Sequence, residues 1–201
     1  MKVSVQFEKK PLLFQNPKFI ISCFDSSSFT ACFKDIEGAL RHGYHLAGFL
    51  SYEAGYCFEE KLREDKTYDF PLIYLGAYEA PLKYSISPET KPFQSILKDL
   101  SLNITRDKYF LNIQTIRDYI AQGEVYQVTY CIKLLFKFYG DPLFLYNLLL
   151  KEQPVPYPAY IETDRFHILS CSPEMFIKKE SMHTVTKPMK GTWRRGDNMI
   201  S

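Results

Sequence analysis

The sequence predicts a folded chain that contains both β-strands and α-helices, with strands in the majority. Two observations lead to this prediction. Hydrophobic residues make up 46% of the 201 residues and aromatic residues 16%, which is typical of a buried core and excludes a disordered chain. Segments that alternate in polarity with a period of two are interspersed with segments of helical spacing. The length fits one large domain or two small ones.

Charge and cysteine content narrow the function classes. A formal net charge of +2 does not indicate the strongly basic surface that binds nucleic acid or an anionic membrane. The five cysteines are an odd number without C-x-x-C spacing, so we expect neither a disulfide framework nor a thiolate zinc site. The longest apolar run covers only residues 143–150, far short of the roughly 20 residues of a membrane span. We therefore expect a soluble, cytoplasmic protein.

Residues 1–84 are expected to form a β-rich N-terminal part. Four segments have the character of strands, namely residues 3–7, 19–24, 46–52 and 72–78. Gly48 lies inside one of them, where a glycine indicates a bulge or a close approach of another backbone segment. A short helix over residues 35–42 is expected to end at Gly43. Residues 85–105 are polar and interrupted by prolines, so we expect a surface connection there.

Residues 106–201 begin with a clear helical pattern. Thr105 is the expected N-cap and Gly123 the expected end of this helix, whose apolar face is formed by Tyr109, Ile113, Ile116 and Ile120. A long strand over residues 125–138 and a helix over residues 141–151 should follow. Four short strands at hairpin spacing are then expected, around residues 159–161, 166–169, 175–177 and 184–186.

In two segments, a proline restricts the backbone conformation close to a charged side chain. In Ser172-Pro173-Glu174, a small polar residue and a proline hold a carboxylate at a strand end. In the second segment, Lys190 stands between Pro188 and Gly191, which restricts the chain on one side of the lysine and leaves the other side open to a ligand. From the residues alone, these two segments are compatible with two interpretations: they form a functional site, or they are surface turns without a role in function.

The same two segments resemble the chorismate-binding enzymes, the family that includes anthranilate synthase, aminodeoxychorismate synthase and the isochorismate synthases. The resemblance is carried by Ser172-Pro173-Glu174, by Lys187-Pro188-Met189-Lys190-Gly191-Thr192 and by Arg194-Arg195-Gly196. It extends to three further segments, namely Gly123-Glu124-Val125-Tyr126-Gln127-Val128, Pro156-Tyr157-Pro158-Ala159-Tyr160 and residues 47–56. It thus covers most of the chain from about residue 46.

Two positions indicate the branch of the family. Anthranilate synthases carry alanine at the position of Lys190, whereas aminodeoxychorismate synthase component I carries a nucleophilic lysine there. Isochorismate and salicylate synthases carry a water-activating lysine at the position of Gln127. Lys190 together with Gln127 therefore resembles aminodeoxychorismate synthase component I. Anthranilate synthase component I is the alternative enzyme, and a non-catalytic remnant that binds chorismate or a partner is the alternative of another class.

The resemblance also implies roles for individual residues. Lys190 would be the nucleophile and Glu174 the general acid. Gly191 and Thr192 would contact chorismate. The segment Pro156-Tyr157-Pro158 aligns with a stretch that holds tryptophan in some relatives.

The expected roles require uncommon protonation states. A free lysine amine has a pKa of about 10.4, and that pKa must fall to about 7 for Lys190 to attack, while Glu174 must hold a proton. In a dry pocket, transfer of one proton from the lysine to the glutamate would give a neutral pair that buries no charge.

The resemblance further implies the fold and the cofactor. The fold is α+β, with packed mixed or antiparallel β-sheets and outer helices, incomplete at the C-terminus. Residues 106–201 would be the first part of the chorismate-binding catalytic region. The family uses Mg²⁺, whose ligands we expect after Ser201, with no metal ligand in this chain. The expected partner is a glutamine amidotransferase subunit that supplies ammonia. We therefore expect residues 1–201 alone to be inactive.

Overall fold

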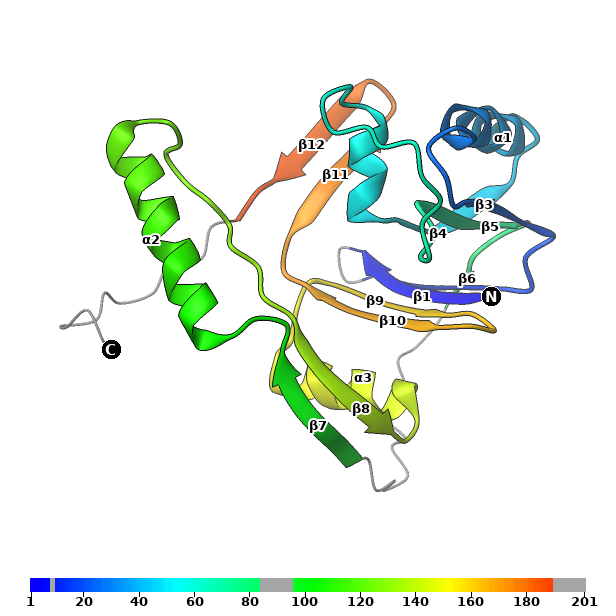
Figure 1. Cartoon of the computed structure of the whole chain (residues 1–201). Coiled ribbons are helices and arrows are strands. Elements are labelled where there is room, and N and C mark those ends of the chain that lie inside the picture. Colours follow the sequence, from blue (N-terminus) through cyan, green and yellow to red (C-terminus); the bar gives the residue numbers. More distant parts are fainter. Residues whose placement is uncertain (8–9, 84–95, 190–201) are drawn as a thin grey trace. The chain divides into compact units, whose positions relative to one another are not determined.

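The computed structural model of the chain describes residues 1–7, 10–83 and 96–189 (Figure 1). The chain divides into two compact units, which are described separately below. Unit 1 comprises residues 1–89 and 146–201, and unit 2 comprises residues 90–145. No helix in the described ranges is long and apolar enough to cross a membrane.

The larger sheet of unit 1 joins the beginning of the chain to its last third. Its strands are β1 (Lys2–Phe7), β2 (Lys10–Gln15), β6 (Leu82–Lys83), β9 (Tyr157–Glu162) and β10 (His167–Ser172). They lie in the order β10-β9-β1-β2-β6, and every pairing is antiparallel. Strand β1 is central, because it pairs with β2 on one side and with β9 on the other.

The smaller sheet of unit 1 has the order β3-β5-β4 and is also antiparallel. It is formed by β3 (Phe19–Cys23), β4 (His45–Leu50) and β5 (Ile73–Tyr78). Helix α1 (Phe29–Arg41) contacts β3 and β4, and a 3-10 helix, η1 (Tyr52–Cys57), follows β4. The prediction for Gly48 is confirmed: the residue has a φ of +156°, and a Cβ atom there would overlap the carbonyl oxygen of Tyr74.

The two sheets of unit 1 share one hydrophobic core. Val3 from β1, Ala47 from β4, Tyr78 from β5 and Ile161 from β9 belong to a single buried cluster. A second cluster lies where α1 meets the smaller sheet. Unit 1 also contains the hairpin of β11 (Met175–Glu180) and β12 (His183–Lys187).

Unit 2 contains β7 (Ile96–Leu102), α2 (Arg106–Gln122) and β8 (Leu134–Tyr139), with β7 and β8 paired antiparallel. The predicted caps of α2 are confirmed: the side chain of Thr105 accepts a hydrogen bond from the backbone N–H of Lys108 at 3.4 Å, and Gly123 adopts the left-handed conformation with φ +79°. Helix α3 (Pro142–Glu152) begins in unit 2 and ends in unit 1.

The α+β class with packed antiparallel sheets is therefore confirmed. The expected surface connection over residues 85–105 contains β7, whose residues are all exposed and whose partner, β8, lies far along the chain. Two other local expectations were wrong. The long strand expected over residues 125–138 is restricted to β8, since only that part finds a partner. Helix α1 begins at Phe29 rather than at residue 35. The division into residues 1–84, 85–105 and 106–201 stays a prediction.

Candidate functional site

The strand register of unit 1 brings two of the predicted site segments together. Tyr157, the first residue of β9, pairs with Ser172, the last residue of β10. Glu174 follows Ser172 by two residues and directly precedes β11. The segment Pro156-Tyr157-Pro158 and the segment Ser172-Pro173-Glu174 therefore lie at the same end of neighbouring strands.

The turn that carries Glu174 is fixed by a side chain. The hydroxyl of Ser172 donates a hydrogen bond to the carbonyl oxygen of Glu174 at 2.9 Å, and it accepts one from the N–H of Glu174 at 3.3 Å. Met175, the next residue, is buried. The Glu174 side chain is exposed, so its backbone is held at both ends while its carboxylate stays accessible to a ligand.

The segment Pro156-Tyr157-Pro158 is anchored by its central and last residues. The Tyr157 ring lies with its centroid 5.7 Å from that of Phe7 in β1. Pro158 is buried and Pro156 is exposed. Tryptophan binding by this segment stays a prediction.

The remaining predicted residues, Lys190, Gly191 and Thr192, lie outside the described residues. The described chain that leads to them is β12, which ends at Lys187. Lys187 pairs with Met175, the residue next to Glu174. The branch-indicating Gln127 belongs to unit 2, where it is exposed in a segment without helix or strand.

One face of the β11–β12 hairpin adds charged residues that the sequence analysis did not select. It is hollowed by a pocket of about 160 Å³, lined by Met175, Lys178, Glu180, His183, Val185 and Lys187. The Lys178 ammonium forms an ion pair with Glu180 at 3.0 Å and lies 5.8 Å from the centroid of the Phe7 ring. The signal available in the sequence was the alternation of residues 183, 185 and 187, which places them on one face of a strand.

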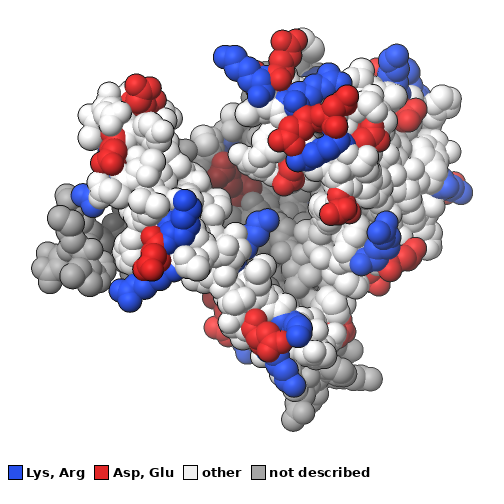
Figure 2. Space-filling model, viewed as in Figure 1, with Lys and Arg blue, Asp and Glu red and all other residues white. Residues whose placement is uncertain are grey.

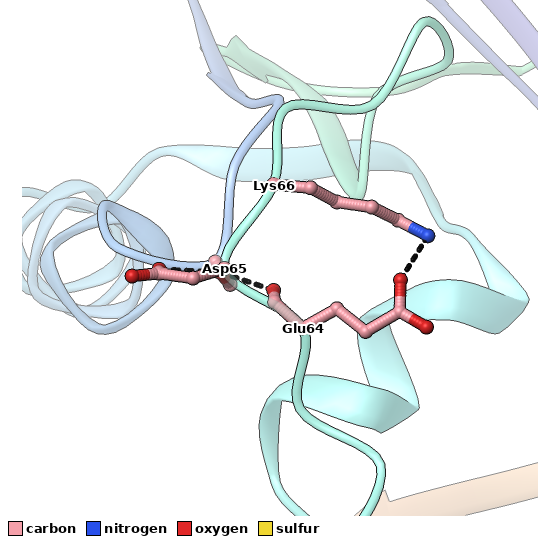
Figure 3. A network of polar contacts seen from close by, with 4 residues as sticks. Glu64, Asp65 and Lys66 are labelled. Carbon is pink, nitrogen blue, oxygen red and sulfur yellow. Dashed lines mark hydrogen bonds and ion pairs between the residues drawn. The ribbon is translucent and has the colours of Figure 1, made fainter.

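A second polar cluster in unit 1 anchors a charged loop (Figure 3). The buried hydroxyl of Ser26 donates a hydrogen bond to the carbonyl oxygen of Glu64 at 2.8 Å and contacts the carboxylate of Asp65 at 3.4 Å. Glu64 forms an ion pair with Lys66 and so raises the pKa of that ammonium. Because both partners of the pair are about half exposed, we interpret the cluster as a structural anchor of the loop.

The described residues do not form a metal site. No group of three or more His, Cys, Asp or Glu side chains in the described ranges is placed to hold a metal ion. We therefore assign no step of a reaction to a metal held by these residues, and Mg²⁺ with ligands after Ser201 stays a prediction. On the face shown in Figure 2, the described basic and acidic side chains are interspersed, in agreement with the net charge of +2.

Comparison with known proteins gives a family match over almost the whole chain. A family model described as chorismate binding enzyme matches residues 5–200. Aminodeoxychorismate synthase component 1 of Bacillus subtilis (strain 168) is 36% identical over 138 residues, which are 69% of this chain. Anthranilate synthase component 1 is 31% identical over 99 residues (49% of this chain) in Aquifex aeolicus and 30% identical over 94 residues (47%) in Thermus thermophilus.

These relatives are much longer than the matched segments. The match spans 28% of the Bacillus protein and 20% of each of the two anthranilate synthases. The matched part of the chain thus spans less than a third of the length of each of these relatives.

Proposed function

This chain belongs to the chorismate-binding enzyme family, and on that premise we propose that it acts as aminodeoxychorismate synthase component I. The proposed reaction replaces the C4 hydroxyl of chorismate with an amino group and keeps the enolpyruvyl ether. Its product, 4-amino-4-deoxychorismate, would lead to 4-aminobenzoate and folate. The observation that carries the proposal is the presence of Lys190 together with Gln127.

Lys190 favours this branch because a covalent intermediate requires a nucleophile at that position. The similarity to the Bacillus aminodeoxychorismate synthase, which extends over 69% of the chain, supports the same branch. Anthranilate synthase component I is the second candidate, favoured by the two relatives of that name. The two candidates differ in whether the product carries its nitrogen at C4 or at C2.

In the proposed reaction, the amine of Lys190 attacks C2 of chorismate while the two ring double bonds shift and the C4 hydroxyl departs. Hydroxide is a poor leaving group, so Glu174 donates a proton and the hydroxyl leaves as water. Ammonia then attacks C4, both ring double bonds shift back, and the lysine amine is expelled from C2. The balance is chorismate plus ammonia giving 4-amino-4-deoxychorismate plus water. Gly191 and Thr192 are the proposed contacts to the substrate.

The described geometry supports this pairing of roles. Glu174 is held by Ser172 at one end of the β11–β12 hairpin. Lys187, at the same end, pairs with Met175. Lys190 follows Lys187 by three residues, and three residues of chain span at most about 11 Å. This short connection supports the proposed pairing of Lys190 with Glu174.

Two further components belong to the proposal. Mg²⁺ would bind through ligands outside this chain's described residues and would neutralise carboxylate charge on the substrate. A glutamine amidotransferase subunit would supply the ammonia. Free ammonium salts should replace that subunit in an assay, because ammonia is the attacking species.

The test is a product assay on the natural-length protein, wild type beside Lys190→Ala, with chorismate, Mg²⁺ and ammonium. We expect wild type to form aminodeoxychorismate, separated by chromatography, and the variant to lose this product. Anthranilate from wild type would assign the protein to the second candidate. Chorismate binding without any product would instead indicate a non-catalytic remnant.

A further inference from the structure

Strand β3 forms an open edge of the smaller sheet of unit 1. Among the described strands it pairs only with β5, on one of its two sides. Its sequence, Phe-Ile-Ile-Ser-Cys, contains no charged residue and no proline, and Phe19 and Ile20 expose 42% and 37% of their surface. Charges, prolines and bulges are the usual devices that stop the unpaired N–H and C=O groups of an edge from pairing with a further strand. The five residues of β3 lack the first two of these devices, so β3 is suited to receive another strand.

The edge of β3 is one wall of a groove, and helix α1 is the other. The groove has a volume of about 490 Å³ and is lined by residues 19–22 of β3 and by one face of α1 that includes Lys34, Asp35 and Gly38. Consecutive residues of a strand point to opposite faces of its sheet. Because four consecutive residues of β3 line the groove, it runs along the edge of the strand, with α1 beside it (Figure 1).

Gly38 leaves free space on the helical wall of the groove. It lies inside α1, where glycine costs about 0.5–1 kcal/mol relative to alanine. A Cβ atom at this position would meet no atom within 4 Å, so no packing contact within the described part of the chain requires a glycine here. A neighbouring chain in the groove would approach α1 most closely at such a position.

The groove also carries one charge of each sign on adjacent residues of α1. Lys34 and Asp35 are exposed, and in the part of the chain that the structure describes neither forms an ion pair. A surface with a single sign of charge would repel a second copy of itself. A surface with both signs is complementary to its own copy, because a two-fold axis places each lysine near the aspartate of the other copy.

We propose that this groove is the interface of a symmetric dimer, in which β3 of one copy pairs antiparallel with β3 of a second copy. A two-fold axis perpendicular to the sheet joins the two three-stranded sheets into one continuous sheet and brings the two α1 helices together on the same side of it. Lys34 of each copy then pairs with Asp35 of the other. One contact covers both edges, so the assembly closes at two copies. The proposal is independent of the reaction proposed above.

The size of the groove sets the expected strength of the dimer. Nine residues of each copy line it, whereas a stable interface of standard size has about 20–30 residues a side. We therefore expect a weak dimer that dissociates on dilution, with a dissociation constant of about 10–100 μM.

Sedimentation velocity of the natural-length protein, over concentrations that bracket this range, tests the proposal. Asp35→Lys and Lys34→Asp each replace the two cross-pairs by like charges, so each should weaken the dimer by about tenfold. The double variant Lys34→Asp/Asp35→Lys exchanges the charges and should restore the dimer. The control is Glu37→Lys, which makes the same charge change on α1 at a residue that pairs with Arg41 at 3.6 Å and does not line the groove. This variant should dimerise like wild type.

Gly38→Ala separates loss of association from loss of folding. Alanine favours the helix, so the variant should unfold at the same or a higher urea concentration than wild type. Its methyl group occupies space in the groove, so the dimer should be several-fold weaker. Equal dimer strength in Gly38→Ala and wild type would contradict close packing at this position and would overturn the proposed interface.

Hydrogen exchange of the same samples locates the interface. The amides of β3 should exchange more slowly as the concentration rises, because amides paired across the two copies open rarely, and the amides of β10 should not change. A monomer at every concentration would overturn the proposal. A dimer that survives both single charge reversals, or that the double variant fails to restore, would place the contact elsewhere and would also overturn it.

Discussion

The rings of Phe70 and Phe166 lie with their centroids 5.0 Å apart, although the two residues come from distant parts of the sequence. Phe166 precedes β10 in the turn after β9, and Phe70 precedes β5. The Phe166 ring also lies 6.0 Å from that of Phe49 and 5.7 Å from that of Tyr74. This aromatic cluster fastens the turn of the larger sheet onto the smaller sheet, so that the N-terminal strands and the segment leading to Glu174 share one unit.

Phe166→Ala should weaken this connection. We expect a loss of about 2–3 kcal/mol in the free energy of unfolding, below the usual cost of about 3–5 kcal/mol for a fully buried phenylalanine, because Phe166 is half-buried. Urea denaturation followed by circular dichroism measures this loss. The control is Phe176→Ala, whose ring is 87% exposed and should change stability by less than about 0.5 kcal/mol. An equal loss in both variants would contradict a role for the cluster.

Gly48→Ala should destabilise unit 1 strongly. The added Cβ atom would overlap the carbonyl oxygen of Tyr74 in the paired strand, and a φ of +156° disfavours any residue with a side chain. Strain and overpacking together predict a loss of about 2–4 kcal/mol, measured as a lower urea midpoint. Gly38→Ala is the matched control, because a Cβ there meets no atom within 4 Å and alanine favours a helix interior by about 0.5–1 kcal/mol. Gly38→Ala should therefore stabilise the protein slightly.

Sequence reasoning succeeded where local chemistry decides the structure. The caps of α2 follow from Thr105 and Gly123, whose conformational preferences act within one helical turn. The close approach at Gly48 was likewise predictable from a glycine inside a strand. The hairpin of β11 and β12 followed from two short β-prone segments.

Sequence reasoning failed where pairing over long range decides. β7 has no buried residue, so no polarity pattern marks it, and it becomes a strand only because β8 pairs with it. The pairing of Tyr157 with Ser172, which brings two site segments together, depends on the register of β9 and β10. Individual strand patterns do not contain that register.

Tyr78 should make stability fall at alkaline pH. Burial raises the pKa of its hydroxyl to about 12, and this hydroxyl has no hydrogen-bond partner in the described part of the protein. Since an unfolded tyrosine ionises near pH 10, the native state keeps the proton between about pH 10 and 12 while the unfolded state releases it. The contribution of Tyr78 to the free energy of unfolding is therefore fully present below about pH 10, and it is lost as the pH rises to about 12.

Tyr78→Phe separates this effect from the ionisation of other groups. The variant should be as stable as wild type or slightly more stable at pH 8, because it removes a buried hydroxyl without a partner. Between about pH 10 and 12, wild type should lose more free energy of unfolding than the variant, by at most about 3 kcal/mol. Tyr126→Phe, at a position 92% exposed, should follow the wild-type curve. Parallel curves for wild type and Tyr78→Phe would contradict the assignment.

The cysteines should react with iodoacetamide at very different rates. Burial raises the pKa of the Cys32 thiol to about 11, with a further contribution from the neighbouring Cys23, so at pH 8 only about one Cys32 in a thousand is a thiolate. Cys131 is exposed and should be labelled first. Peptide mass spectrometry gives both rates, and Cys131→Ser should remove the fast phase. Equal labelling of both residues in the folded protein would contradict the burial of Cys32.

Glu174→Gln should lower the kcat of the natural-length protein and leave KM nearly unchanged. Loss of a general acid costs about 10²–10⁴-fold in rate, whereas glutamine keeps the size and polarity of the side chain that a bound substrate contacts. Steady-state formation of the product with chorismate, Mg²⁺ and ammonium measures both constants. Glu180→Gln is the control, because Glu180 is an exposed carboxylate of the same hairpin that pairs with Lys178.

Ser172→Ala provides a second arm of this test. It removes both hydrogen bonds that hold the backbone of Glu174 and leaves the carboxylate in place. Because the acid would remain but lose its fixed position, we expect kcat to fall by less than in Glu174→Gln, by about tenfold. In the double variant, Ser172→Ala should add little, since there is no acid left to position. Full turnover by Glu174→Gln would remove Glu174 from the mechanism, and multiplicative losses in the double variant would assign Ser172 a separate role.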